Sequence, residues 1–344
     1  MVFYSRYHEF EEKDAAFKIG RLFGKRIKEI MAIYEIDDEM DEVQRQALEL
    51  TASKLPGCIK EIEERARGAG VSFNQMFKYI IDHDFDTRLE ASKPSDHCTD
   101  VMIKRPDGLI LKGHTEDIYA TEESCAIIKH ITEYGWYVEL AIPEALAGAT
   151  VAWNSKGICF SGNTIYGTQL AKANLPTTLV LRTFVDCGSI DEIVALAKEF
   201  PVMADFNLNI LDKNSNEACS LEISQNKVSV LRLKDYYVHS NHLLHVLGHE
   251  DENTYQILGT NSNTKFRLEK AGELIRGIDI SKADYNDLAK IMGYRGADNL
   301  SSIHKLPIPG TTTDFTVYTV LCDSVTGTIH VTDHISKEQA VFLW

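Results

Sequence analysis

The sequence predicts an α+β fold in which antiparallel sheets carry helices on their outer faces. Three observations lead to this prediction. Roughly the first 95 residues have apolar side chains at helical spacing, the chain after residue 97 has short apolar runs between turn residues, and both patterns then return in blocks. Blocks of helices and of strands are typical of antiparallel sheets, whereas a doubly wound parallel sheet needs strands and helices in alternation.

Four helices are expected before residue 97. The first is indicated by apolar residues at helical spacing, namely Ile19, Leu22, Phe23, Ile27, Ile30 and Tyr34. A second amphipathic stretch covers residues 38–53. A third begins after Pro56 and ends at Gly70, because glycine accepts the left-handed conformation that follows a helix end. A fourth follows Ser72, a suitable N-cap.

The chain after residue 97 is expected to form most of the strands. Pro106-Asp107-Gly108 separates the apolar runs 101–103 and 109–111, which predicts a hairpin. Alternation and turn residues predict further strands over 136–142, 150–153, 157–161, 206–212, 217–223 and 227–233, and a final hairpin over 316–323 and 327–332. Helical spacing returns over 176–187, 190–199, 265–276 and 284–292. No internal repeat or linker separates these blocks in the sequence.

Composition and charge exclude several classes of protein. A chain of 344 residues with 44% hydrophobic and 25% charged residues has an ordinary globular composition. Its 36 basic and 51 acidic residues give a net charge of −15, which argues against a phosphate-binding surface and a nucleic acid partner. No stretch approaches the roughly 18 apolar residues of a membrane span. The N-terminal residues lack the apolar run of a signal peptide, so we expect a cytoplasmic protein.

One of the seven cysteines stands apart from the others. The seven are odd in number, scattered, and without a CxxC pair, so the sequence suggests neither a disulfide framework nor a zinc ribbon. Cys98 follows a polar, turn-forming segment and has His97 and Asp100 beside it. A thiol in such a place can be exposed and activated. On this local pattern alone, an incidental loop cysteine is the alternative.

A metal site among the histidines at 239, 242, 245 and 249 is the less favoured interpretation. Zinc would need three or four of them to converge within about 2.1 Å of one ion. The chain has no HExxH motif, and histidines that make ordinary hydrogen bonds explain the segment. The sequence therefore predicts no metal site.

A series of short motifs occurs in order along nearly the whole chain. They are Phe17-Lys18-Ile19-Gly20 with Gly24, Cys98-Thr99, Gly113-His114-Thr115-Glu116-Asp117, Trp153-Asn154-Ser155-Lys156-Gly157 with Gly162-Asn163, Asn216 through Glu222-Ile223-Ser224, His239-Ser240-Asn241-His242, and Ser302-Ile303-His304-Lys305. Together they resemble the acyl-coenzyme A:isopenicillin N acyltransferase-like family of self-processing N-terminal-nucleophile (Ntn) hydrolases.

Four positions depart from the family pattern. His97 replaces the usual glycine before the nucleophile, Asp100 replaces a frequent Thr or Ser, and Thr115 replaces an asparagine. Lys305 replaces an arginine, which keeps the charge but loses the planar bidentate fork. These changes affect the transfer of substrate identity more than that of catalytic class.

The resemblance implies a fold and a processing event. The fold would be a four-layer αββα sandwich of two stacked antiparallel sheets. Self-cleavage between His97 and Cys98 would give a helical segment, 1–97, and a nucleophile-bearing segment, 98–344, which remain associated as one domain. No cofactor is implied. The partners would be a small-molecule amide substrate and the cleaved segment itself; the resemblance leaves open whether the chain is a homo-oligomer.

The resemblance also implies roles for individual residues. The catalytic residues would be Cys98, Asp117 and Asn241, and the substrate-binding or supporting residues Thr99, Asp100, Asn154, Asn163, Glu222 and Lys305. Each role has a structural alternative. Asp117 and the asparagines are common turn or loop residues, and Lys305 could be a solvated charge.

The chemistry of a cut chain can be stated from general principles. Cleavage before Cys98 would free an α-amino group with a pKa of about 8, and this amine can act as the base for its own thiol. Asp117 would orient the ammonium. Asn241 would supply an amide N–H to the oxyanion, an interaction worth about 3 kcal/mol in a dry site.

Three functions follow from these expectations. The leading hypothesis is an amidohydrolase that forms a thioester on Cys98 of the processed chain. The first alternative is an acyltransferase of the 6-aminopenicillanic acid type, which passes the acyl group to an amine. The second is an unprocessed, non-enzymatic protein that binds a small ligand. A papain-like protease is disfavoured because its local Cys-Gly-Ser-Cys-Trp signature is missing.

Overall fold

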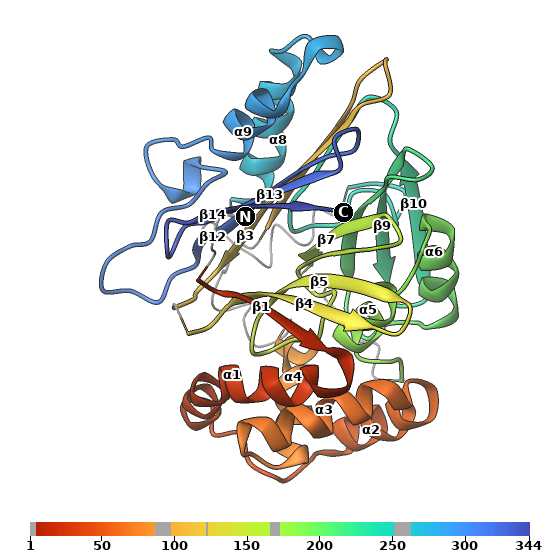
Figure 1. Cartoon of the computed structure of the whole chain (residues 1–344), viewed down its shortest axis with the longest axis vertical. Coiled ribbons are helices and arrows are strands. Elements are labelled where there is room, and N and C mark those ends of the chain that lie inside the picture. Colours follow the sequence, from red (N-terminus) through yellow and green to blue (C-terminus); the bar gives the residue numbers. More distant parts are fainter. Residues whose placement is uncertain (1–4, 87–97, 122, 166–172, 251–262) are drawn as a thin grey trace.

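The computed structural model describes residues 5–86, 98–121, 123–165, 173–250 and 263–344 (Figure 1). His97, the predicted residue before the cleavage point, lies outside these ranges. Within them the strands form one eight-stranded and one six-stranded sheet, whose members are named below in their order across each sheet. No helix in these ranges is both long and apolar enough to cross a membrane.

The eight-stranded sheet is antiparallel except at one edge. Its members are β1 (Tyr7–Glu11), β4 (Ala126–Thr132), β5 (Gly135–Ala141), β6 (Val151–Asn154), β7 (Ile158–Thr164), β8 (Phe206–Asp212), β9 (Glu217–Ser224) and β10 (Lys227–Arg232). All neighbouring pairs are antiparallel except β1 and β4, which are parallel.

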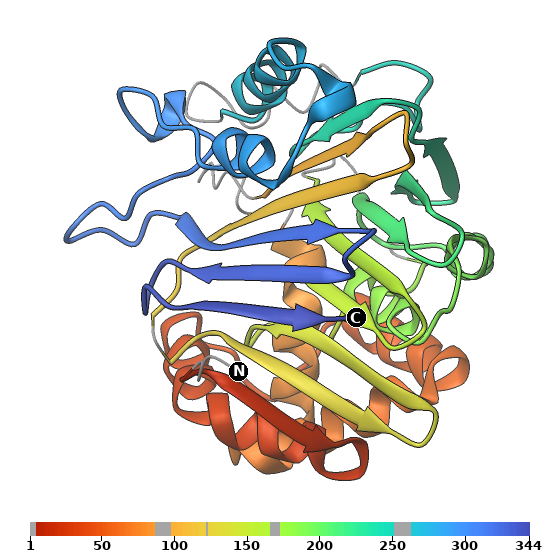
Figure 2. The same cartoon turned by 45° about the horizontal axis from the view of Figure 1, so that its top comes forward.

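The six-stranded sheet is antiparallel throughout and includes the C-terminal strands (Figure 2). Its members are β11 (Tyr236–His239), β2 (Thr99–Lys104), β3 (Ile110–Ile118), β12 (Phe315–Asp323), β13 (Thr328–Asp333) and β14 (Gln339–Leu343). The predicted hairpin at 101–111 corresponds to β2 and β3, and its turn uses Gly108 at a φ of 96°.

Helices cover the outer face of each sheet (Figure 1). On the side of the eight-stranded sheet lie α1 (Glu12–Ile33), α3 (Pro56–Ala69), α4 (Phe73–Asp86), α5 (Thr177–Phe184) and α6 (Ile190–Glu199), and α2 (Glu42–Lys54) packs on α3. Those on the six-stranded sheet are α8 (Thr264–Arg276) and α9 (Tyr285–Met292). Two 3-10 turns, η3 (Ile280–Lys282) and η4 (Asn299–Ser301), flank α9.

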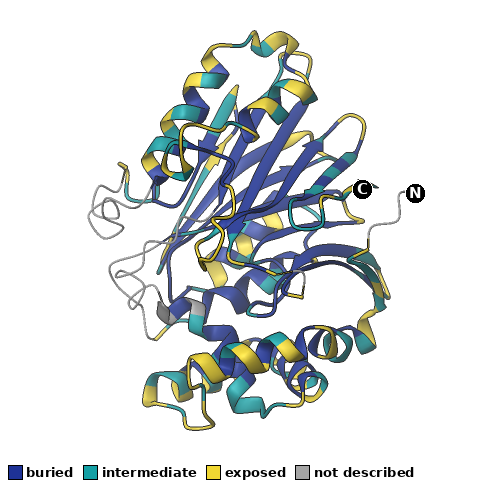
Figure 3. Ribbon diagram, turned by 90° about the vertical axis from the view of Figure 1, so that its left-hand side faces the viewer, coloured by how far each residue is buried: buried dark blue, intermediate teal, exposed yellow. Residues whose placement is uncertain are grey.

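Three apolar cores lie between four layers, so the predicted αββα sandwich is confirmed. One core joins the helices of the first 86 residues, with α5 and α6, to the eight-stranded sheet. A second fills the space between the two sheets, and the third joins the six-stranded sheet to α8 and α9. Figure 3 shows the result: buried strands in the middle, and helices whose exposed residues face outward.

The sequence prediction of a wholly helical N-terminal segment is wrong at one place. Tyr7–Glu11 forms β1, an edge strand that pairs in parallel with Ala126–Thr132. Its burial pattern contains no fully buried residue, so an apolar signal for a strand is missing. Pairing with a neighbouring strand, rather than local propensity, forms this element.

The helical segment is tied to the rest of the chain by charge as well as by apolar contacts. Arg182 Nε on α5 lies 2.7 Å from Glu61 Oε2 on α3, and both side chains are largely buried. Because breaking a largely buried ion pair is costly, this contact opposes separation of the segment.

Helices α1 and α3 cross at two glycines. A Cβ added to Gly20 would overlap the carbonyl oxygen of Arg65, and one added to Gly68 would overlap that of Phe17. The absence of both side chains allows the two backbones to pack in direct contact.

Two Gly→Ala substitutions, one at this crossing and one away from it, are expected to change the free energy of unfolding in opposite directions. Gly20→Ala should lower the free energy of unfolding by about 1–3 kcal/mol because the added methyl overpacks the crossing. Gly57→Ala, also in a helix but with nothing within 4 Å of the added Cβ, should raise it by up to about 1 kcal/mol through helix propensity. Urea unfolding measures both values. A Gly20→Ala chain as stable as the Gly57→Ala chain would contradict the packing argument.

Candidate active site

The pairing of β2 with β3 determines where the Cys98 side chain points. The antiparallel register pairs Thr99 with Thr115 and Asp100 with His114. Continuing that register by one residue places Cys98 opposite Glu116. Because side chains alternate along a strand, Cys98, Asp100, His114 and Glu116 share the face that points toward the other sheet.

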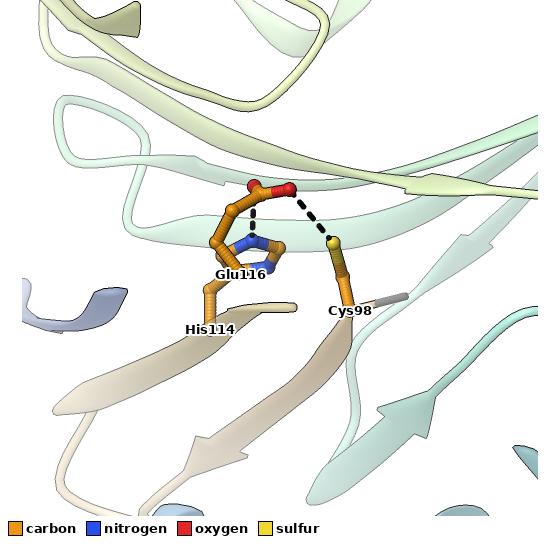
Figure 4. A group of neighbouring side chains, drawn as sticks. All are labelled: Cys98, His114 and Glu116. Carbon is orange, nitrogen blue, oxygen red and sulfur yellow. Dashed lines mark hydrogen bonds and ion pairs between the residues drawn. The ribbon is translucent and has the colours of Figure 1, made fainter. Parts of the chain in front are cut away.

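These side chains form a continuous chain of contacts, of which Figure 4 shows Cys98, Glu116 and His114. Cys98 Sγ donates to Glu116 Oε1 over 3.2 Å, and His114 Nε2 lies 3.1 Å from Glu116 Oε2. On the far side of the imidazole, His114 Nδ1 lies 2.9 Å from Asp100 Oδ2. The order of groups is therefore thiol, carboxylate, imidazole and carboxylate, all of them buried.

Asp100 is fixed by further buried groups. Lys112 Nζ lies 3.2 Å from Asp100 Oδ1, and Ser161 Oγ from β7 donates to the same oxygen. Burial acts to raise the pKa of Asp100, but His114 and Lys112 lower it well below its usual range. Burial likewise acts to lower the pKa of His114, and Asp100 raises it well above the usual value. The two side chains form a buried ion pair.

The Cys98 thiol is protonated in this environment. Burial first, and then the Glu116 carboxylate, raise its pKa to about 12. Only 3% of the residue is exposed to solvent. Since the thiolate is the nucleophilic form of cysteine, reaction at Cys98 requires a group that accepts the thiol proton.

A buried arginine that the sequence analysis did not single out connects the start of β2 to other parts of the site. Arg267 on α8 has no exposed surface. Its guanidinium donates to four oxygens: Cys98 O at 2.5 Å, Thr99 Oγ1 at 2.8 Å, Asn241 Oδ1 at 2.6 Å and Asn263 Oδ1 at 2.6 Å. Arg267 thereby joins the main chain at Cys98 to Asn241, although the two are distant in sequence.

A sequence signal for Arg267 does exist. Residues 267, 271 and 275 follow one another at helical spacing, and all three are buried. Ala271 and Ile275 identify this stripe as the inner face of α8, so a charged residue on it must have buried partners.

Asn241 is held by three hydrogen bonds. Its Oδ1 accepts from Arg267, its Nδ2 donates to Thr164 O over 2.9 Å, and its backbone N–H donates to Thr264 Oγ1 over 2.8 Å. The structure therefore brings Asn241 and the Cys98 main chain to one guanidinium. The predicted oxyanion role of Asn241 stays a prediction.

Glu222 on β9 holds the segment that follows Asn241. Its carboxylate accepts backbone N–H groups at 2.6–2.9 Å and the His239 Nε2–H at 2.9 Å; the backbone donors are Leu244, His245 and Val246. Burial acts to raise the pKa of Glu222, but His239 and His245 lower it to about 2. Glu222, one of the predicted supporting residues, therefore fixes residues 239–246 through these hydrogen bonds, and we call this arrangement the Glu222 clamp.

Asp117 and Lys305 lie on the side of β3 opposite to His114. Thr316 Oγ1 donates to Asp117 Oδ1 over 2.7 Å, and Lys305 Nζ lies 3.6 Å from Asp117 Oδ2. Burial raises the pKa of Asp117, and Lys305 and Arg267 oppose this. Lys305 is buried and paired, so the alternative of a solvated charge does not hold.

The two remaining predicted asparagines occupy different surroundings. Asn154, the last residue of β6, donates to Val185 O and Cys187 O and accepts from the Ile158 backbone N–H. Its predicted supporting role stays a prediction. Asn163 faces the space between the sheets and accepts from Asn209 Nδ2 over 2.9 Å.

One group in the described ranges has donor atoms that could hold a metal ion. The Cys98, His114 and Glu116 donors lie within 4.8 Å of one another. Sulfur, imidazole and carboxylate are the donor set of zinc. Two contacts link the three side chains, one between Cys98 Sγ and Glu116 Oε1 and one between His114 Nε2 and Glu116 Oε2. These two contacts account for the short distances among the three side chains.

Comparison with known sequences gives two matches. A sequence model of the family described as "Acyl-coenzyme A:6-aminopenicillanic acid acyl-transferase" matches residues 103–307. The Beta-alanyl-dopamine/carcinine hydrolase of Drosophila melanogaster is 23% identical over 229 residues, which cover 59% of this chain and 58% of that protein. The chain therefore matches less than two thirds of the length of this relative.

Comparison with solved structures gives further matches. A variant of conjugated bile acid hydrolase from Clostridium perfringens has a TM-score of 0.47 at 14% identity, and covers 71% of this chain and 92% of that one. Penicillin V acylase from Agrobacterium tumefaciens has a TM-score of 0.44 at 10% identity, and covers 71% and 86% of the two chains.

The Glu222 clamp predicts a pH-dependent stability difference. The pKa of Glu222 is about 2 in the folded chain and 4.5 in an unperturbed glutamate. Its contribution to the free energy of unfolding is therefore complete above about pH 4.5 and is lost as the pH falls toward 2. Glu222→Gln should therefore lower the free energy of unfolding by about 2–3 kcal/mol at pH 7 and by much less at pH 3. Urea unfolding at both pH values measures this. An equal deficit at both would rule out the ionised clamp.

Proposed function

Because the chain belongs to the acyl-coenzyme A:6-aminopenicillanic acid acyl-transferase family, we propose that it is a self-processing amidohydrolase with Cys98 as its nucleophile. It cleaves the bond between His97 and Cys98, and it then hydrolyses a small N-acyl amide through a thioester on Cys98. One observation carries this proposal: Cys98 lies at the start of a buried strand, with a proton acceptor at its thiol and Arg267 fixing its main chain to Asn241.

The two products of cleavage remain associated. Side chains of α1, α3 and α4 share one apolar core with the eight-stranded sheet, and Glu61 pairs with Arg182 across the same boundary. Separating the segments would expose this core and break the ion pair between Glu61 and Arg182. The segment 1–97 is therefore proposed as a permanent partner of the segment 98–344.

The proposed turnover uses the amine that cleavage creates. The α-amino group of Cys98 takes the thiol proton, and Sγ attacks the amide carbonyl of the substrate. An amide nitrogen has two N–H bonds, and Asn241 uses one on Thr164 O, so the other is the proposed oxyanion donor. The amine product leaves with the proton, and water then hydrolyses the thioester.

N-β-Alanyl amides of small amines are the proposed substrate class. The support is the name of the Drosophila melanogaster relative, a Beta-alanyl-dopamine/carcinine hydrolase. Acyl transfer to an amine is the second candidate, and the description of the family favours it. Release of free β-alanine identifies the hydrolase, whereas a new β-alanyl amide formed with an added amine identifies the transferase.

Substitution of two cysteines tests the nucleophile. Cys98→Ala should remain one chain of 344 residues and release no amine from an N-β-alanyl amide, because it lacks the thiol that forms the proposed thioester. Cys159→Ala is the control, because this buried cysteine also faces the other sheet but contacts Cys322 instead. It should be cut and active. Intact mass and amine release give the two readouts. A Cys98→Ala chain that is cut at the same bond, or that retains turnover, would exclude Cys98.

Arg267→Lys tests the connection to Asn241. Lysine keeps the charge but cannot reach four oxygens with a planar fork, so kcat/KM for the same amide should fall about 10- to 100-fold. Arg276→Lys, at the exposed end of the same helix, should leave kcat/KM unchanged. Equal kcat/KM values for the two variants would show that the fork has no role.

A further inference from the structure

The self-cleavage step needs a base that the uncut chain must supply by itself. Before cleavage the nitrogen of Cys98 belongs to a peptide bond, so it has no lone pair free to accept a proton. The thiol is buried and protonated. The amine that serves turnover is therefore missing from the first reaction that Cys98 performs.

We propose that Glu116 is the catalytic base of self-cleavage, and that His114 and Asp100 are the residues that position it. This proposal rests on the proposed function and adds a separate base for its first step. Cys98 Sγ donates directly to Glu116 Oε1 over 3.2 Å, which is the contact that a proton acceptor requires (Figure 4).

The two oxygens of Glu116 have different partners. Oε1 faces the thiol, while Oε2 lies 3.1 Å from His114 Nε2. The imidazole is in turn fixed by Asp100, which Lys112 and Ser161 hold. The contact with His114 fixes Oε2, so that Oε1 stays directed at the thiol. The carboxylate cannot rotate away without breaking the bond to His114.

The other carboxylates near Cys98 are already bound elsewhere. Asp100 accepts from three groups, His114, Lys112 and Ser161. Asp117 lies on the opposite face of β3 and is bound to Thr316 and Lys305. Among the described residues, Glu116 is the carboxylate whose oxygen contacts Cys98 Sγ.

The proposed step conserves atoms and charge. Sγ forms a bond to the carbonyl carbon of residue 97 while its proton passes to Glu116 Oε1. The C–N bond then breaks as Glu116 returns that proton to the nitrogen of Cys98, which becomes a free amine. The product is a thioester. Water cleaves the thioester to the carboxylate of residue 97 and the Cys98 thiol. Glu116 has then given back the proton that it accepted.

The test compares the cleavage rates of freshly synthesised chains. The parent, Glu116→Gln, Glu116→Asp and Glu139→Gln are produced by cell-free translation, and intact mass follows the cut fraction over time. Glu139→Gln is the matched control, because Glu139 is also a buried glutamate paired with a histidine, His130, at 2.7 Å. Each chain is also treated with hydroxylamine, which attacks a thioester that has already formed. Circular dichroism confirms folding.

The expected result is specific to the base. Glu116→Gln is cut about 100-fold more slowly than the parent, and hydroxylamine does not restore the rate because the thioester itself does not form. Glu116→Asp, which keeps a carboxylate, is cut faster than Glu116→Gln. Glu139→Gln is cut at the parent rate.

Three results would overturn the proposal. Glu116→Gln could be cut at the parent rate, hydroxylamine could restore its rate in full, or Glu139→Gln could be slowed as much. In each case the proposed function survives, since the parent is still cut at Cys98. A parent chain that is never cut would instead overturn the self-cleavage in the proposed function and this base with it.

Discussion

The arrangement of the site depends on one buried cation. The Arg267 guanidinium has no exposed surface, and an unpaired charge there would be strongly destabilising. The fold satisfies it with oxygens from the start of β2, from Asn241 and from Asn263 at the beginning of α8. These groups come from three separate parts of the chain, so their common position is a consequence of satisfying a single side chain.

The second half of the site follows from strand register. Because β2 and β3 pair in the register that sets Thr99 against Thr115, the residue before β2 lies opposite Glu116. Side-chain alternation then directs Cys98 toward the space between the sheets and leaves Asp117 on the helix-covered face. Cys98 thus lies between two buried networks: neutral oxygens that accept from Arg267, and the charged side chains that surround Asp100.

Sequence patterns predicted most of the fold and part of the site. Periodicity and turn residues identified the main helices and the β2–β3 hairpin, but β4, β11 and β14 were missed, as was β1, whose formation depends on pairing with a distant strand. His114 and Glu116 stood in a recognised motif at positions that the motif leaves variable. The pairing of Asp117 with Thr316, 199 residues apart, requires the tertiary structure. The catalytic roles of Asp117 and Asn241 stay predictions.

The central claim is that Cys98 carries the acyl group during turnover, and the location of that group tests it most directly. The processed chain is mixed with excess N-β-alanyl amide, quenched in acid, digested and analysed by mass spectrometry. We predict a β-alanyl adduct on the peptide that begins with Cys98, attached at Sγ and removed by hydroxylamine. An adduct on any other side chain would contradict it.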